Sequence, residues 1–168
     1  SLASGATQSG FGRSGSVNWQ TSDIKTSTFT AASGEGYFIN QGSAITMNLP
    51  AGTAGAIVAV SDYARNFATY NLTITPNGSQ KIGGQAASAT LNVNGQAATF
   101  VYVDDTKGWV NVQNAEDTET GVSFIAATGG TTTTAGDFKI HTFTGPGTFC
   151  VSNVGNPAGS TSVDYMVV

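Results

Sequence analysis

Residues 44–49, Ala-Ile-Thr-Met-Asn-Leu, show the pattern that decides the fold of this chain. Isoleucine, methionine and leucine alternate with polar residues there, and alternate residues of a β-strand point to opposite faces of its sheet. The pattern predicts a strand with one buried face, which Pro50 ends. Residues 71–75, Asn-Leu-Thr-Ile-Thr, repeat this alternation and precede the turn sequence Pro-Asn-Gly at 76–78.

Further strands are expected on both sides of these two. Residues 56–60 and 100–103 are continuous apolar runs, which predicts strands buried near the centre of the fold. Asn94 and Gly95 separate two alternating runs, and this dipeptide favours a type I′ turn in a tight hairpin of two core strands. Additional strands are predicted at residues 27–31, 36–40 and 107–112.

The spacing of these strands, about 8–12 residues, is typical of a sandwich or barrel. We therefore expect an all-β chain in which residues 26–113 form an antiparallel, jelly-roll-like β-sandwich. Helical periodicity is nearly absent. Residues 61–70 alone suggest either a helical turn, capped by Asp62, or a long loop.

The two ends of the chain have a different composition from the sandwich. Residues 1–25 are rich in Ser and Gly and predict either an extended arm lying on a neighbour or a disordered leader. Residues 114–121 carry three acids and no apolar residue larger than Ala, which predicts a linker at 114–122. Residues 123–168 predict a small C-terminal β module with strands at 123–128, 136–143, 147–152 and 162–168.

This module is too short to bury its own apolar strands, because domains of this size rarely stand without a metal, disulfide or partner. The sequence given stops within an apolar strand, so either that strand pairs with a partner or the chain is a piece of a longer protein. We expect homo-oligomeric assembly through apolar residues of the arm and the module: Phe11, Val17, Trp19, Val163, Tyr165 and Val167.

Composition excludes several functional classes. The 168 residues include only 10% charged residues and have a net charge of −4, with no basic patch, so nucleic acid is not an expected partner. No apolar run reaches the ~20 residues that span a bilayer, and the first residues lack the features of a signal peptide. One cysteine and one histidine exclude an intrachain disulfide and most multi-histidine zinc sites.

Three features are candidates for chemistry. His141 lacks a nucleophile elbow and is interpreted as a half-exposed strand histidine. Asp104 and Asp105 follow a buried strand and suggest either a Ca²⁺ or acid–base site or, as we favour, a hairpin turn. Cys150 has apolar neighbours and is interpreted as a buried thiol. No catalytic residue, cofactor or metal is predicted.

Aromatic residues offer one further hypothesis. Stacking on aromatic rings is a common way to hold sugars, and the alternative fate of such residues is core packing. A carbohydrate or partner contact surface would draw on the aromatic residues Trp19, Tyr63, Phe67, Tyr70 and Trp109.

Several strings together go beyond composition. They are residues 9–21 (SGFGRSGSVNWQT), 30–38 (TAASGEGYF), 49–52 (LPAG), 71–74 (NLTI), 101–104 (VYVD), Asp62-Tyr63, Asn77-Gly78-Ser79 and Gly108-Trp109. They resemble a module of tail-fibre and other virion proteins of marine tailed bacteriophages. Residues 127–130, 136–149 and 163–168 are similar to the segment that leads into a glycine-rich tip in such proteins.

The resemblance implies a non-enzymatic virion component in an extracellular particle, most simply a tail-fibre protein that takes part in host attachment. It suggests a trimer, contacts with other virion proteins and with a host surface glycan, and no membrane insertion. It transfers no catalytic residue. The glycine run that usually follows the final strand is missing here. Alternatives are a capsid decoration protein, a self-assembling filament subunit and a carbohydrate-binding domain, whereas a depolymerase would need paired carboxylates in one groove.

Overall fold

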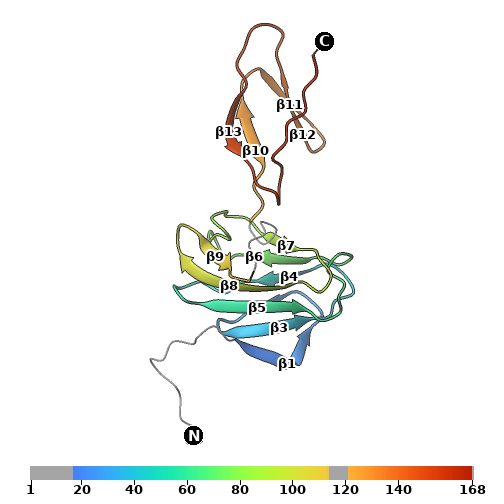
Figure 1. Cartoon of the computed structure of the whole chain (residues 1–168), viewed down its shortest axis with the longest axis vertical. Helices are drawn as coiled ribbons and strands as arrows, with labels where there is room; N and C mark the ends of the chain where they lie inside the picture. The colour runs from blue at the N-terminus through green and yellow to red at the C-terminus, as the bar shows by residue number, and fades with distance from the viewer. Residues whose placement is uncertain (1–16, 114–120, 168) are drawn as a thin grey trace, which may run out of the picture.

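The structure is a computed structural model that describes residues 17–113 and 121–167. Two parts follow one another along the long axis in Figure 1, first a β-sandwich and then a smaller β module. All thirteen secondary-structure elements of the described residues are strands, so the predicted all-β class is confirmed. In the same residues no helix is long and apolar enough to cross a membrane.

The sandwich consists of two sheets. Sheet A has the strand order β1-β3-β5-β8-β9, and sheet B has the order β2-β4-β6-β7. The strands of sheet A are β1 (Asn18–Lys25), β3 (Glu35–Ile39), β5 (Ile57–Asp62), β8 (Ala97–Asp104) and β9 (Gly108–Asn111). Those of sheet B are β2 (Phe29–Thr30), β4 (Ile45–Asn48), β6 (Leu72–Thr75) and β7 (Ala89–Leu91).

The first six strands alternate between the two sheets, so the chain winds as a flattened coil. Each strand lies beside the strand one full turn earlier and runs in the same direction, which makes β1–β3, β3–β5, β2–β4 and β4–β6 parallel pairs. Of the antiparallel, jelly-roll-like sandwich that we expected, only the pairs β6–β7, β5–β8 and β8–β9 are antiparallel. Period-two alternation is the same in both kinds of ladder, so it could not reveal the difference.

Strand β1 occupies residues that we expected to belong to the arm. It pairs with β3 from Asn18 opposite Glu35 to Lys25 opposite Ile39, with one register shift between. Residues 18–25 are therefore part of sheet A, and the predicted arm boundary at residue 25 lies too late. Residues 1–16 lie outside the described part of the chain, as does most of the predicted linker.

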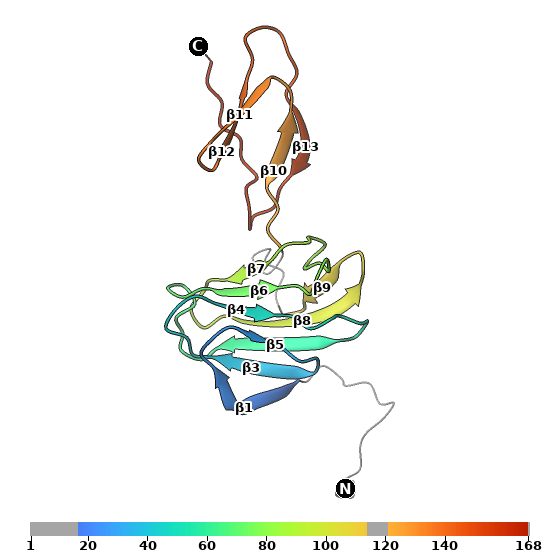
Figure 2. The same cartoon turned by 180° about the vertical axis from the view of Figure 1, so that it is seen from behind.

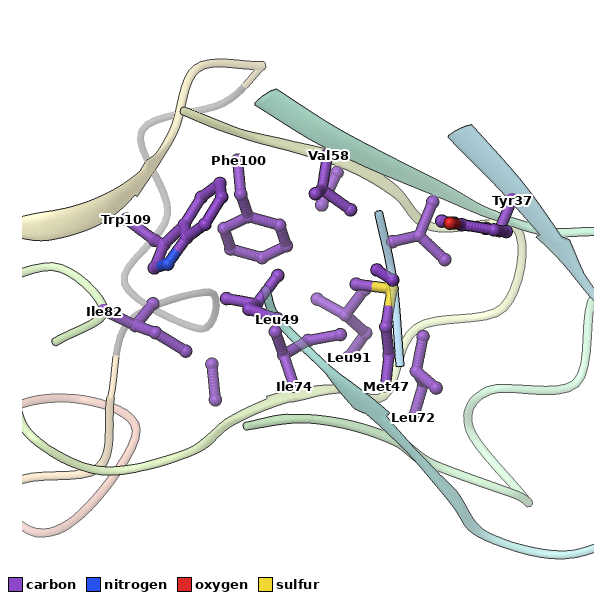
Figure 3. Close-up of a cluster of buried hydrophobic side chains, with 14 of the residues drawn as sticks. Tyr37, Met47, Leu49, Val58, Leu72, Ile74, Ile82, Leu91, Phe100 and Trp109 are labelled. Carbon is purple, nitrogen blue, oxygen red and sulfur yellow. The ribbon is translucent and has the colours of Figure 1, made fainter. Parts of the chain in front are cut away.

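The core is a single apolar layer between the sheets (Figure 3). Trp109, Phe100 and Val58 of sheet A point toward Leu49 and Ile74 on the side of sheet B. All five side chains are almost completely buried. Because burying one such side chain stabilises by roughly 1.5–3 kcal/mol, this layer supplies most of the folding free energy of the sandwich. The strands predicted from alternation at 44–49 and 71–75 contribute their apolar residues to it, as expected.

The Asn94-Gly95 turn is present, but its type and its connection differ from the prediction. The amide of Gln96 donates to the carbonyl of Val93 at 3.0 Å, which closes a four-residue turn. Gly95 has a φ of 79°, whereas Asn94 has none in the left-handed region, so a type I′ turn is excluded. The turn joins β7 of sheet B to β8 of sheet A, which are not paired neighbours.

Residues 63–71 form a loop rather than a helix. Asp62 organises this loop, because its Oδ2 accepts the amide of Phe67 at 3.1 Å and that of Gly95 at 2.9 Å. Phe67 is buried in the core as a result. The expected cap at Asp62 thus exists, and it fixes a loop and the 94–95 turn together.

The C-terminal module contains two separate two-stranded ribbons (Figure 2). β10 (Ile125–Thr128) pairs antiparallel with β13 (Cys150–Val154), and β11 (Thr131–Ala135) pairs antiparallel with β12 (Phe138–Thr142). The expected strands at 123–128, 136–143 and 147–152 are found with shifted bounds. The strand expected at 162–168 is not formed, because residues 161–167 pair with no other described strand.

Replacement of Gly95 by Val should destabilise the sandwich by more than about 1 kcal/mol, because a β-branched residue tolerates a positive φ poorly. Gly42 is the matched control: it is exposed, its φ is not in the left-handed region, and a Cβ there would meet nothing within 4 Å. Urea unfolding of Gly95→Val and Gly42→Val measures the difference. Equal free energies of unfolding would show that the turn does not constrain the fold.

Candidate functional site: an assembly surface without a core

The two parts of the chain differ sharply in burial. The sandwich buries a continuous cluster of apolar side chains from Ala31 to Trp109. In residues 124–167, all of which the structure describes, no residue is buried. The module therefore has regular strands but no core of its own.

Its exposed residues are nonetheless large and apolar. Tyr165 is 90% exposed and Phe138 is 73% exposed, although an isolated soluble domain keeps such side chains inside. The exposed apolar side chains of the module are Phe124, Phe138, Ile140, Phe143, Phe149, Val151, Val154, Val163, Tyr165, Met166 and Val167.

This exposure has an energetic consequence. Fixing the backbone of one residue costs about 1–2 kcal/mol, and burial of apolar side chains is the main term that offsets it. Summed over the five aromatic residues of the module, the exposed fractions equal about three whole residues. At roughly 150–250 Å² for each aromatic residue, the exposed aromatic surface is roughly 450–750 Å². Large exposed apolar surfaces in soluble proteins commonly mark interaction sites, so the module is the candidate interaction site of this chain.

Polar contacts hold the start of the module in shape, and the sequence analysis did not identify them. The Asn156 side chain donates to the carbonyl of Gly121 at 2.8 Å and accepts the amide of Ser123 at 3.1 Å. Asn153 donates to the hydroxyl of Ser123 at 3.0 Å. Both asparagines lie in a Gly/Pro-rich stretch, where they would ordinarily be interpreted as turn residues.

The same segment joins the module to the sandwich. The amide of Gly121 donates to the carbonyl of Ile82 at 3.0 Å, and that of Val122 donates to Ser88 at 3.3 Å. A Cβ at Gly121 would come within 2.8 Å of the carbonyl oxygen of Ala87, so only glycine fits at this contact. Residues 121–122, predicted as the end of a linker, thus bind to the loop between β6 and β7.

The residues predicted for assembly fall into three groups. Val163, Tyr165 and Val167 are exposed in the module, as described above. Val17 and Trp19 lie over Gly36 of β3, because a Cβ added to Gly36 would come within 3 Å of both side chains. Val17 and Trp19 thus have a contact within the chain that we had not expected. Phe11 lies outside the described residues.

The aromatic residues proposed for a carbohydrate platform do not come together. Trp109 and Phe67 are fully buried in the core, so their assignment to a surface is wrong. Trp109 packs edge-on against the ring of Tyr102 at a centroid distance of 5.6 Å. Tyr63 is exposed, and Tyr70 is half-buried at the other end of the loop. A small sandwich needs large aromatic side chains to fill its core, so these rings are not available on its surface.

Asp104 and Asp105 form a turn, as we favoured. Asp104 Oδ1 accepts the amides of Thr106 at 2.8 Å and Lys107 at 2.7 Å, which closes the β8–β9 hairpin. Asp105 accepts the hydroxyl of Tyr102, and this hydrogen bond raises the pKa of Tyr102. Among the described residues, no group of three His, Cys, Asp or Glu side chains is placed to hold a metal ion.

The single histidine and the single cysteine both lie in the module. His141, on β12, is half-buried as expected, and its Nδ1 lies 2.7 Å from the carbonyl oxygen of Gly129. The ring of Phe149 contacts it edge-on at 5.3 Å. Cys150 is exposed, so the prediction of a buried thiol is wrong for the single chain. Its apolar neighbours Phe149 and Val151 suggested burial, but nothing in this chain covers them.

A cluster of titratable residues lies at one end of sheet A. The Tyr37 hydroxyl donates to Glu35 at 2.6 Å and accepts the amide of Ala32 at 2.8 Å. Lys25 lies over the Tyr37 ring, 5.5 Å from its centroid. Burial and the bond to Glu35 raise the pKa of Tyr37 to about 12, so this phenol stays protonated and serves as a structural donor.

Neither a comparison with protein-family models nor one with curated proteins finds a match for this chain. The candidate site is thus defined by its own geometry.

Alkaline pH should destabilise the sandwich partly through Tyr37. The folded chain keeps the Tyr37 proton up to about pH 12, whereas the unfolded chain loses it near 10. The contribution of this pKa difference to the free energy of unfolding is fully present below pH 10 and is lost as pH rises through 12. Urea unfolding across this range should show a steeper decline for the native chain than for Tyr37→Phe. Parallel curves would contradict the assignment.

Proposed function

We propose that this protein is a non-enzymatic structural component of a bacteriophage virion, namely a tail-fibre protein that takes part in host attachment. The observation that carries the proposal is the absence of any buried residue among residues 124–167. Such a module gains a core by packing against copies of itself, and cyclic homo-oligomers are the usual way in which soluble chains do this. The phage link rests on the sequence resemblance, which also favours a trimer.

The chemistry of the chain supports a structural role. Asp104, a carboxylate considered for acid–base work, accepts backbone amides in the β8–β9 turn, and Asp62 accepts an amide in the loop at 63–71. A glycan-binding platform loses support, since two of its five aromatic residues lie in the core. Capsid decoration and filament formation use the same coreless module and remain the alternative functions.

The first test is the mass of the full chain in solution. We expect about 51 kDa by light scattering, three times the chain mass of 17.0 kDa. Tyr165→Asp should weaken association at least about tenfold, because it places a charge among apolar contacts. Tyr63→Asp is the matched control, since Tyr63 is an exposed tyrosine of the sandwich. A 17.0 kDa monomer whose module amides resist hydrogen exchange would overturn assembly.

The second test locates the protein in the particle. Antibodies against the chain, applied to purified particles of the phage that encodes it, should label tail fibres in electron micrographs. Labelling of the capsid would establish decoration in place of a fibre role. Particles without label, checked against an antibody to a known capsid protein, would exclude a virion component.

A further inference from the structure

The outer faces of the two sheets differ in chemistry. In sheet B, Thr46 of β4 lies opposite Thr73 of β6, which lies opposite Thr90 of β7. Asn48 and Thr75 form the next row, and their neighbours in sequence, such as Met47 and Ile74, are buried in the core. The outward face of sheet B is thus a hydroxyl and amide surface, as expected for a face in contact with water.

Sheet A presents apolar side chains outward instead. Val101 of β8 lies opposite Ile57 of β5 and Val110 of β9, while the adjacent Phe100 points into the core. Trp19 of β1 lies opposite Gly36, and its ring stacks on Phe38 at 4.9 Å. The outward apolar residues of sheet A are Trp19, Phe38, Ile57, Ala59, Val101 and Val110.

The outward positions at which β5, β8 and β9 pair hold no charged residue. Besides Ile57, Ala59, Val101 and Val110, those positions hold Ser61, Ala97 and Thr99. Ala59, which lies opposite Gly36 and Thr99, is buried, whereas Val103 is 50% exposed. Two copies of such a face would meet without electrostatic repulsion and without burying an unpaired charge.

The size of the face can be compared with that of protein interfaces. Five strands about 4.8 Å apart, with about five residues of 3.3 Å each, give a face of roughly 400 Å². A stable interface needs about 800 Å² per partner. The face of sheet A and the exposed aromatic surface of the module, roughly 450–750 Å², reach that value together but not separately.

We propose that the outward face of sheet A packs against other copies of this chain. The strands of sheet A are stacked along the long axis of the molecule, and the module extends along the same axis (Figures 1 and 2). Copies arranged around one axis parallel to it can therefore bury both surfaces. The proposal rests on the self-assembly proposed above and adds the part of the sandwich that joins it. The hydroxyl-rich face of sheet B then faces solvent.

The test compares two central outward positions in the full chain. Val101 of sheet A and Thr73 of sheet B are both half-buried in the single chain. Val101→Lys should weaken association at least about tenfold by sedimentation, and Thr73→Lys should leave it unchanged. An assembly that tolerates Val101→Lys as well as Thr73→Lys would overturn the proposal for sheet A while leaving the role of the module intact.

Cysteine labelling provides a second measurement that does not depend on a charged substitution. In a Cys150→Ser background, Val101→Cys should react with maleimide at least about tenfold more slowly than Thr73→Cys in the assembled chain. With Tyr165→Asp added to both labelled chains, the difference should vanish at dilutions where they are monomeric. Equal rates in the assembly would overturn the proposal. Slow labelling of Val101→Cys in the monomer would also overturn it, because a segment of the same chain would then cover the face. A native chain that is monomeric throughout would overturn the proposed function itself.

Discussion

Burial of one apolar layer between sheets A and B is the constraint on which the rest of the structure depends. Strands β3 to β9 give their inward residues to this layer, from Val58 and Phe100 on one side to Met47 and Ile74 on the other. Once alternate residues point inward, the outward residues add no side chain to this layer. Their chemistry is then open to other uses, and the two sheets use it in opposite ways.

The polar contacts around the core are placed where the coil changes direction. Asp62 ends β5 and binds both the 63–71 loop and the turn at Gly95 through one oxygen atom. That carboxylate connects the last parallel turn of the coil to the antiparallel strand β8. A buried acid with these two bonds acts as a structural cap, because hydrogen bonds to a carboxylate are stronger than those between neutral groups.

The sequence allowed the strands to be predicted better than their partners. Alternation at 44–49 and 71–75 identified β4 and β6 because it reports which face is buried. It carries no information on the neighbouring strand, so the parallel coil was missed, as was β1 beside β3. Trp109 was misassigned for a related reason, since an aromatic residue in a strand has the same pattern whether it faces the core or solvent. The exposed module could be anticipated from its length alone, whereas the contacts of Asn156 required the structure.

The contrast between the two parts also implies an order of events during assembly. The sandwich buries its core within one chain, so it can fold before any encounter. The module has no buried core with which to offset its ordering cost, so in the proposed assembly its strands gain stability when another copy covers Phe138, Tyr165 and their neighbours. Folding and association would then be coupled, and module stability would depend on protein concentration. In that assembly the sheet A face requires no further folding before contact, whereas the module becomes ordered as the contact forms.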